Sequence, residues 1–349
     1  MKSNFDFLNR YWPALAQIGA TAETYVYSDP NACIYKLGMF AERLVQEILV
    51  FEHIADANRI RILKRAGLLP HEIDNTLYVL RKTRNTAVHT GTDSVDEAKT
   101  LLSLTYNLAV WFMETYGDWG YIAPEFVMPS ETTHEDLESV IAEQERKIEE
   151  LTKQLAVVKT AASGKTQKER AKRSESVSAM MNWNEAQTRC LIDEQLRLSG
   201  WEADTQNLRY SKGTRPVKGR NIAISEWPTN SAFYKNGYAD YAFFVGEKLV
   251  ALMDAKKMSE DVASTIDVQV KDYAAHIKPE DIPHTVGNWN GYQVPFLFAS
   301  NGRAYLEQLR TKSGIWFLDV REQENQPYPI RNWFSPSDLM EKLGQNTAA

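Results

Sequence analysis

The sequence predicts an α+β chain of two domains, with an all-α helical bundle first and an α/β domain last, joined by a helical or coiled-coil linker. Three observations predict it. Apolar residues recur at helical spacing up to about residue 120, and a second periodic segment follows Pro124 and Pro129. Beyond residue 179, short apolar runs alternate with helical segments. A chain of 349 residues is long enough for two hydrophobic cores.

The helical bundle is expected over residues 1–130. Its clearest helix carries apolar side chains three and four positions apart, at Ile34, Leu37, Ala41, Leu44, Val45, Ile48 and Leu49. A second series continues the pattern at Leu101, Leu102, Leu104, Leu108 and Val110. Side chains at these spacings share one helical face, so both segments should pack against other helices. Gly67 and Pro70 interrupt the pattern and mark an expected break between helices.

The region 131–178 should connect the domains. One face of its first part repeats at spacings of four and three, through Leu137, Ile141, Gln144, Ile148, Leu151, Leu155 and Val158. This spacing indicates either a short self-associating coiled coil or a solvated spacer helix. The stretch 159–178 is small, polar and basic, which predicts a flexible linker.

Within that stretch, Ser163-Gly164-Lys165-Thr166 resembles the end of a phosphate-binding loop. However, Lys159 occupies the position of the loop's first glycine, and no strand precedes it. We therefore expect that this chain does not bind ATP.

The expected α/β domain covers residues 179–349. Apolar runs before and after Gly246-Glu247-Lys248 predict a β-hairpin that carries Asp240 on one strand and Asp254 and Lys256 on the other. Residues two apart on a strand share a face, so Asp254 and Lys256 should point the same way. A two-residue loop would turn Asp254 away from Asp240, whereas a three-residue loop or a bulge would bring both carboxylates to one face.

Two carboxylates on one face suit Mg²⁺, which keeps several waters and commonly bridges to phosphates. The spacing therefore favours phosphodiester chemistry, with Asp240 and Asp254 as metal ligands and Lys256 offsetting charge on the phosphate or orienting water. The alternative is two acids at a strand edge and a solvated lysine. A helix expected over Asp261–Ile277 places Gln269 and Tyr273 on one face, toward the same cleft.

These residues resemble a known family. Asp240, Asp254-x-Lys256 and Gln269-x-x-x-Tyr273 are similar to the PD-(D/E)xK nuclease core of the restriction (R) subunit of type I restriction-modification enzymes. The resemblance extends over about residues 180–340. It includes Glu185-Ala-Gln-Thr-Arg189, Leu191-Ile-Asp193, Gly200-Trp201, Leu208-Arg-Tyr-Ser-Lys-Gly213, Arg215-Pro216, Ala223-Ile-Ser-Glu-Trp-Pro228, Phe296-Leu-Phe-Ala-Ser-Asn-Gly-Arg303 and Ser313-Gly-Ile-Trp-Phe317. The sequence departs from the family pattern at Ala239, where a proline is usual, and at Asp254, where Glu is more frequent.

The resemblance implies a Mg²⁺-dependent endonuclease that acts on double-stranded DNA as a type I site-specific deoxyribonuclease. Asp240, Asp254, Lys256, Gln269 and Tyr273 would form its catalytic site, and Glu185 is a candidate for a further acid. No helicase motif occurs in the chain, so the motor would lie in a longer subunit or in another polypeptide. A separate methyltransferase-specificity subunit would supply sequence recognition.

A basic stretch precedes the hairpin, with Arg209, Lys212, Arg215, Lys218 and Arg220 and no acid among them. The formal net charge of −6 excludes a uniformly basic coat for nucleic acid, but this loop can lie along a phosphate backbone. The alternative is an ordinary solvated loop.

A second motif lies in the bundle. Arg84 and His89, with four residues between them, resemble the signature of HEPN-type helical domains, some of which are ribonucleases. His89 could act as a general acid or base and Arg84 could hold a phosphate. The alternative, which we favour, is that both residues stabilise the end of a helix.

Three other functions remain open: a ribonuclease that uses Arg84 and His89, a DNA-binding subunit that does not cleave, and a helical domain that only docks partner subunits.

Cys33 and Cys190 do not have the spacing of metal ligands, so we expect free thiols in a reducing compartment. No signal peptide or apolar run of membrane-spanning length is present, so we expect a cytoplasmic protein. Buried strands are expected at 294–300 and 315–320, with a short helix from Tyr305 to Arg310 between them.

Overall fold

The computed structural model describes residues 3–54, 59–90, 94–131, 137–152, 160–231, 237–260, 262–305, 307 and 310–344, without the side chains of 59, 86, 88–90, 137–140, 152 and 263. The chain divides into two compact units, Met1–Met181 (the helical unit) and Asn182–Ala349 (the sheet unit). The expectation of a helical N-terminal region followed by a domain built on a sheet is therefore confirmed.

The helical unit contains seven α-helices in the described residues: α1 (Pro13–Tyr25), α2 (Pro30–Phe51), α3 (Arg59–Arg65), α4 (His71–Thr90), α5 (Val95–Phe112), α6 (Leu137–Thr152) and α7 (Gln167–Met180). Short 3-10 turns occur at Asp6–Arg10 and Ala161–Gly164, and a π-helical turn at Met113–Gly117 extends α5. The apolar positions predicted from the spacing, such as Leu37, Leu44 and Leu104, are buried in its core. The expected break is present, because α3 ends before Gly67 and α4 begins after Pro70.

Helix α6 packs against the helical bundle of its own chain. Its apolar seam packs within the chain, against the same bundle, where Ile148 is 4% exposed. Lys36 of α2 pairs with Glu145 at 2.6 Å, and Thr24 of α1 hydrogen-bonds Gln144 at 3.3 Å. The described part of the helix is thus not a solvated spacer. Leu155 and Val158 lie outside the described residues.

The flexible linker expected over 159–178 is wrong, because most of this stretch forms α7. Thr166 and Glu169 form a capping box, in which each side chain hydrogen-bonds the backbone N–H of the other residue and so satisfies two free donors at the helix start. Arg170 then makes a buried two-point ion pair with Glu52, with both N–O distances 2.7 Å. The polar composition reflects capping and ion pairing rather than disorder.

The sheet unit is built on one mixed sheet in the order β1-β2-β3-β4-β5-β6-β7. Its strands are β1 (Glu202–Ala203), β2 (Asn221–Pro228), β3 (Tyr238–Val245), β4 (Lys248–Ala255), β5 (Phe296–Ser300), β6 (Ile315–Asp319) and β7 (Tyr328–Pro329). Only β1–β2 and β4–β5 are parallel pairs, and the other neighbours are antiparallel. The alternation of strands and helices expected from the sequence is present at the β4–β5 crossover, whereas most neighbouring strands are antiparallel.

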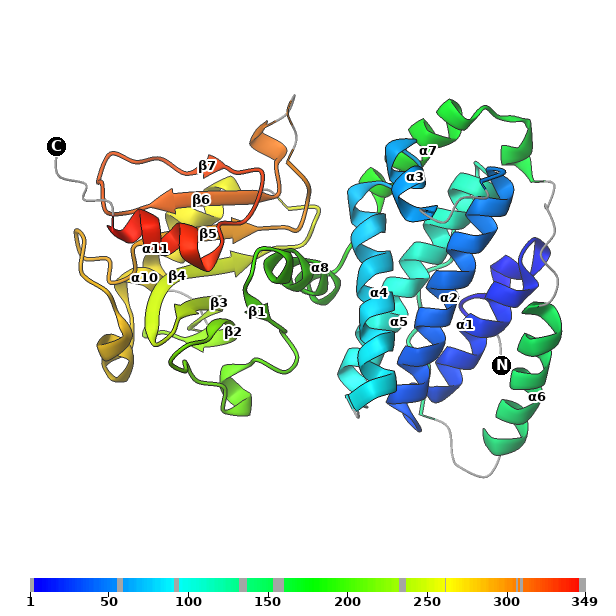
Figure 1. Ribbon diagram of the computed structural model, residues 1–349, viewed down its shortest axis with the longest axis horizontal. Coiled ribbons are helices and arrows are strands. Elements are labelled where there is room, and N and C mark those ends of the chain that lie inside the picture. The colour runs from blue at the N-terminus through cyan, green and yellow to red at the C-terminus, as the bar shows by residue number, and fades with distance from the viewer. Residues whose placement is uncertain are drawn as a thin grey trace. The chain divides into compact units, whose positions relative to one another are not determined.

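Helices cover both faces of this sheet (Figure 1). One face packs Ile192 and Leu196 of α8 (Glu185–Leu198) and Leu339 of α11 (Pro336–Gly344) against the strands. The other packs the helical segment formed by α9 (Ala263–Thr265), a π-helical turn (Ile266–Val270) and α10 (Lys271–Ala275). Short 3-10 turns lie at Tyr210–Lys212, Pro279–His284 and Arg310–Lys312.

The helix expected over Asp261–Ile277 is thus present over 263–275, and Asp261 itself lies outside the described residues. The helix expected from Tyr305 to Arg310 is wrong at Tyr305 and Glu307, which are not helical. Six residues form too few hydrogen bonds to hold a helix without strong packing. The buried strands expected at 294–300 and 315–320 correspond to β5 and β6.

A β-bulge sets the register of the β3–β4 hairpin. Near the turn, Phe244 pairs with Leu249 and Val245 with Lys248, so the loop has only two residues, Gly246 and Glu247. The register then shifts by one residue, so that Phe243 pairs with Ala251 and Tyr241 with Met253. Of the arrangements considered from the sequence, the structure has the short loop together with a bulge.

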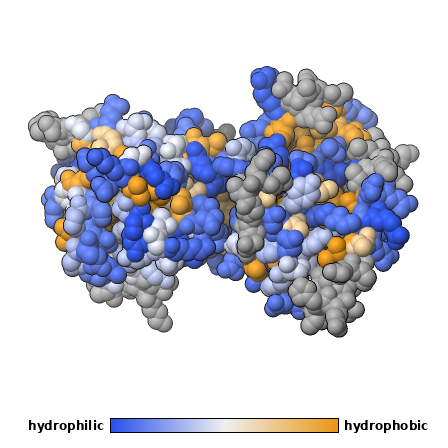
Figure 2. Space-filling view, turned by 60° about the horizontal axis from the view of Figure 1, so that its bottom comes forward, coloured by the Kyte–Doolittle hydropathy of each residue, from blue (hydrophilic) through white to orange (hydrophobic). Residues whose placement is uncertain are grey.

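On the face shown in Figure 2, hydrophilic residues predominate and hydrophobic ones form separate patches. None of the helices in the described part of the chain has the length and apolar character needed to cross a membrane.

Candidate active site

The bulge brings two carboxylates together. Because Tyr241 pairs with Met253, the next residues in the same register, Asp240 and Asp254, lie opposite each other on adjacent antiparallel strands. Both residues are buried, at 7% and 3% exposure. The side chain of Asp240 also reaches the β4 backbone, where its Oδ2 accepts a 2.6 Å hydrogen bond from the N–H of Ala255.

Lys256 follows β4 and lies on the same face as Asp254. Its Nζ is 2.5 Å from Asp254 Oδ2 and donates to Gln269 Oε1 at 2.9 Å. The amide nitrogen of Gln269 in turn donates to Asp254 Oδ1 at 3.1 Å and to the Tyr273 hydroxyl at 2.7 Å. Gln269 therefore links the acid, the lysine and the tyrosine. It sits on the π-helical turn, a local distortion that often occurs at functional sites.

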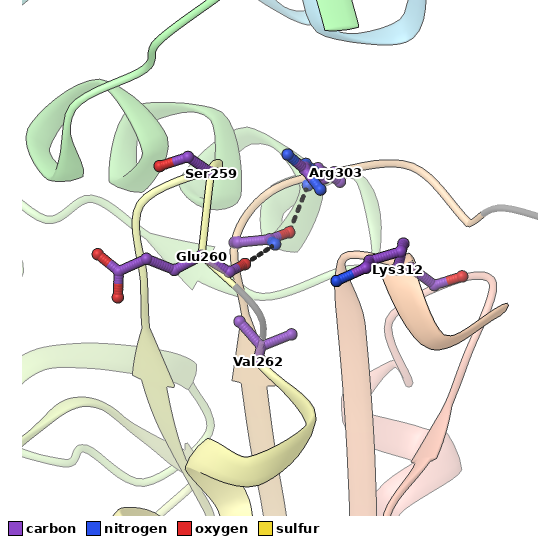
Figure 3. Close-up of a pocket in the computed structure, with 7 residues that line it drawn as sticks. Ser259, Glu260, Val262, Arg303 and Lys312 are labelled. Carbon is purple, nitrogen blue, oxygen red and sulfur yellow. Dashed lines mark hydrogen bonds between the residues drawn. The ribbon is translucent and has the colours of Figure 1, made fainter. Parts of the chain in front are cut away.

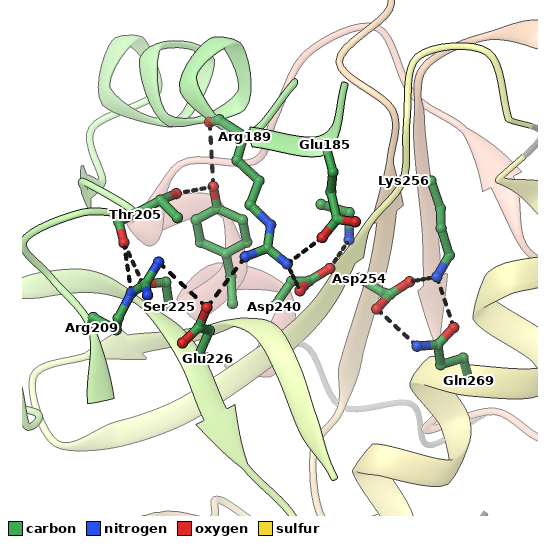
Figure 4. A network of polar contacts seen from close by, with 12 residues as sticks. Glu185, Arg189, Thr205, Arg209, Ser225, Glu226, Asp240, Asp254, Lys256 and Gln269 are labelled. Carbon is green, nitrogen blue, oxygen red and sulfur yellow. Dashed lines mark hydrogen bonds and ion pairs between the residues drawn. The ribbon is translucent and has the colours of Figure 1, made fainter. Parts of the chain in front are cut away.

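Arg189 of α8 approaches Asp240 from the other side (Figure 4). Its Nη2 atom contacts Asp240 Oδ1 and pairs with Glu185 at 2.7 Å, while Nη1 lies 3.6 Å from Glu226 on β2. On β2, Ser225 pairs with Tyr241 and Trp227 with Ala239, so Glu226 lies beside Asp240 on the neighbouring strand. The φ of Glu226 is 54°. A non-glycine residue in this left-handed region is strained and needs support from its surroundings, which Arg189 and Arg209 supply here.

Burial and mutual repulsion favour protonation of the two acids. Burial raises the pKa of Asp240, Asp254 adds to the rise, and Arg189 opposes it. Burial also raises the pKa of Asp254 above its usual value, against the lowering effect of Lys256. For Lys256, burial lowers the pKa of the ammonium, but the nearby carboxylates outweigh it and the net pKa is raised. Positive charge placed between the acids would relieve this cost.

The donor set fits a hard divalent cation. Oδ2 of Asp254 is buried and lies 2.5 Å from Lys256 Nζ, so the carboxylate is held next to a cation within the protein. Two carboxylates together with water and substrate phosphate are the usual ligands of Mg²⁺. Within the described residues, no group of three or more His, Cys, Asp and Glu side chains is placed to hold a metal. The carboxylates that lie opposite each other at this point are those of Asp240 and Asp254.

Comparison with known proteins gives the chain's relationship. Residues 202–343 match the family model described as the second domain of the type I restriction enzyme EcoKI endonuclease subunit. The EcoKI endonuclease subunit of Escherichia coli (strain K12) is 29% identical over 425 aligned residues, which cover 98% of this chain. The chain is related to the type I restriction endonuclease subunit.

That match covers 36% of the EcoKI subunit, so the chain spans about a third of its relative's length. No solved structure matches the chain. The matched range contains Asp240, Asp254, Lys256, Gln269 and Tyr273, whereas Glu185 and Arg189 precede it. The expected resemblance to the restriction subunit is confirmed.

The structure brings Glu185 near this site only through Arg189. The Glu185 side chain is 51% exposed and its carboxylate pairs with Arg189, which lies between it and Asp240. Figure 4 shows the Arg189 guanidinium next to the carboxylates of both Glu185 and Asp240.

Most cations of the basic stretch contact other residues of the sheet unit. Arg209 pairs with Glu226 at 3.4 Å, and Arg220 pairs with Glu202. Arg215 lies over the Tyr210 ring at 3.6 Å from its centroid. Lys212 and Lys218 are exposed and have no partner within the described part of the chain. These two lysines are the cations of the loop most available to a phosphate backbone.

Arg84 serves the helical unit. It forms an ion pair with Glu42 of α2 and lies 4.9 Å from the centre of the Tyr35 ring. A β-carbon on Gly38 would overlap the Arg84 side chain, so α2 and α4 are in close contact there. His89 lies on α4, but its side chain is outside the description.

Two residues of the network received no role from the sequence. The sequence does indicate one contact of Arg189, because it stands four positions after Glu185 and so shares its helical face. Glu226 is the one charged residue of β2, and a charge within a largely buried strand is the corresponding signal. The sequence does not show that Glu185 and Glu226 contact the same arginine, because β2 and α8 come together only in the folded unit.

Proposed function

We propose that this chain carries the Mg²⁺-dependent DNA endonuclease module of a type I restriction enzyme R subunit, with a PD-(D/E)xK type of fold in its sheet unit. The observation that carries the proposal is the side-by-side placement of Asp240 and Asp254, with Lys256 on the same face. The substrate would be foreign double-stranded DNA. Motor and sequence-specificity functions would come from elsewhere in a restriction complex.

Asp240 and Asp254 would hold the metal, which when bound polarises a phosphodiester oxygen as a Lewis acid. The chain's own residues would do the rest. Lys256, held by Gln269, can orient the attacking water or offset charge that develops on the phosphate. Tyr273 fixes Gln269, and Arg189 with the Ala255 N–H fixes Asp240. Preorganised contacts of this kind keep the reacting geometry without reorganisation during the reaction.

The direct test incubates the purified chain with supercoiled DNA and with RNA, each with Mg²⁺ and with EDTA. Wild type should convert supercoiled DNA to nicked or linear forms only with Mg²⁺, and Asp254→Ala should not. Arg209→Ala is the control, since it removes a charge from the same network without touching either acid. Metal binding without turnover would identify a non-cleaving subunit instead, and preferential cleavage of RNA would contradict the proposal.

A further inference from the structure

A small pocket opens where the loops after β4 and β5 meet the segment before β6 (Figure 3). It is lined by loops that follow β4 and β5 and by the segment that leads into β6, and its polar lining consists of Ser259, Glu260, Asn301, Arg303, Lys312 and Ser313. Because β4 and β5 are parallel, their carboxyl ends lie at one edge of the sheet. Asp254 is near the end of β4, so the pocket and the carboxylate pair share that edge.

The pocket is adjacent to Lys256. The Lys256 N–H donates to Ser300 at the end of β5, at 2.8 Å, and the pocket residue Asn301 comes next in the chain. A strand of nucleic acid that crosses the carboxylate pair would therefore pass this pocket.

The walls of the pocket are fixed before any ligand binds. The Asn301 amide donates to the Glu260 carbonyl at 2.7 Å, and its oxygen accepts from the Arg303 N–H at 3.2 Å. The Asn301 N–H donates to the Gly314 carbonyl, so one buried residue joins all three loops. A β-carbon on Gly314 would overlap the Arg303 backbone, which shows how closely the two segments pack.

The charge inside favours an anion. Arg303 and Lys312 line the pocket from two sides, and the Arg303 guanidinium has no partner among the described residues. The Glu260 carboxylate points away from both cations (Figure 3). Ser259 and Ser313 add hydroxyl groups to the lining. Two cations and hydroxyl donors around a small, preformed pocket suit one phosphate group.

We propose that this pocket binds a backbone phosphate of the DNA strand next to the scissile phosphodiester, with Arg303 and Lys312 as its cationic ligands. The proposal rests on the proposed nuclease function, since it names a second contact for the same substrate. Contacts to phosphate fix the register of the duplex and carry no sequence information.

The test measures DNA binding by the full chain, separately from cleavage. Fluorescence anisotropy with a labelled duplex in EDTA, between 50 and 200 mM salt as in the usual range for such titrations, compares wild type with Arg303→Ala/Lys312→Ala. The double variant should bind about tenfold more weakly. Its slope of log K against log salt should be smaller by about 0.9, the value for one phosphate. The loss should be equal on two duplexes of unrelated sequence.

Arg310→Ala is the matched control, because Arg310 is exposed two positions from Lys312 and does not line the pocket. It should change affinity less than twofold, and Arg303→Lys/Lys312→Arg should restore most of the binding. Thermal unfolding of each variant checks that the fold is retained. Unchanged DNA affinity in the alanine double variant, or an equal loss in Arg310→Ala, would overturn the proposal.

The two proposals fail separately. A wild-type chain that binds DNA but never cleaves it refutes the nuclease, while the loss in the double variant still supports the pocket. Cleavage and binding that are unaffected in the double variant refute the pocket alone. Calorimetry with ATP tests whether the pocket binds the phosphate of a nucleotide instead. ATP binding that disappears in the double variant, while DNA affinity is unchanged, would show a nucleotide site and overturn the DNA assignment.

Discussion

Each acid of the carboxylate pair has its own cationic neighbour. Lys256 contacts Asp254, and Arg189 contacts Asp240, so the pair is partly neutralised without a metal. The two cations differ in what supports them. Lys256 is held by a single amide, whereas Arg189 also binds Glu185 and Glu226. Lys256 is therefore the cation that can move more easily when substrate or metal enters.

The first residue-scale prediction separates metal binding from cleavage. Asp240→Ala and Asp254→Ala should each abolish both Mg²⁺ binding and DNA cleavage. Lys256→Ala should abolish cleavage but retain the metal, because an ammonium group cannot be a ligand and its removal makes the site more negative. Calorimetry with Mg²⁺ and a nicking assay give the two readouts. Wild-type cleavage by Asp254→Ala would show that these residues are not the active site.

The second concerns the buried pair of Arg189 and Asp240, whose side chains are 13% and 10% exposed. Arg189→Ala should destabilise the fold by about 3 kcal/mol, because it leaves a buried carboxylate without its partner. Adding Asp240→Asn should recover part of this loss, since the unpaired charge is gone. Urea unfolding followed by tryptophan fluorescence measures both. Arg209→Ala, at a half-buried pair with Glu226, should cost less than about 1 kcal/mol.

At the scale of elements, local signals decided several boundaries. The capping box at Thr166 begins α7 inside a stretch whose composition otherwise suggests a linker. Asp29 caps α2 in a similar way, since its side chain accepts from the Ala32 N–H at 2.9 Å. In the hairpin, the extra residue of the bulge on β4 determines which face Asp254 occupies.

A prediction follows for α7. Thr166→Ala removes the capping oxygen and should lower the stability of the helical unit by about 1 kcal/mol. Thr166→Ser retains that oxygen and serves as the matched control. Hydrogen exchange of the amides in the first turn of α7 should speed up in the alanine variant and remain unchanged in the serine variant. Equal protection in both variants would show that the ion pair of Arg170 with Glu52, rather than the cap, holds the helix.

Helix α4 carries the other element-scale prediction. Arg84→Ala combined with His89→Ala should leave DNA cleavage unchanged, because Arg84 contacts Glu42 and Tyr35 within the bundle. The cost in stability should be about 1 kcal/mol for a partly exposed ion pair and a cation–π contact. Cleavage and ribonuclease assays on the folded double variant give the answer. A strong RNase activity in wild type that disappears in this variant would support the HEPN-like role instead.

At the scale of the whole molecule, charge and length limit what the chain does alone. The chain carries a net charge of −6, and the cations available to DNA are few and local. It also spans about a third of the related EcoKI subunit. Under the proposed function, long-range positioning on DNA would depend on partners.

The isolated chain should therefore bind DNA weakly, with an affinity that falls steeply as salt rises and does not depend on sequence. Its cleavage with Mg²⁺ should be slow and unspecific. Filter binding over a salt series, with two unrelated duplexes, measures the first property, and mapping of cut sites measures the second. Tight binding or sharp cleavage at one sequence would contradict this dependence on partners.

The sequence by itself determined the order of the parts and the pairing of Asp254 with Lys256 on one face, because helical and strand periodicities are local properties of the chain. It also placed Gln269 and Tyr273 together on one helix. Tertiary structure decided the rest. A bulge, which depends on how β3 and β4 pack into the sheet, brought Asp240 opposite Asp254. Contacts between distant elements placed Arg189 on Asp240 and packed α6 and α7 onto the bundle, and no local spacing encodes such contacts.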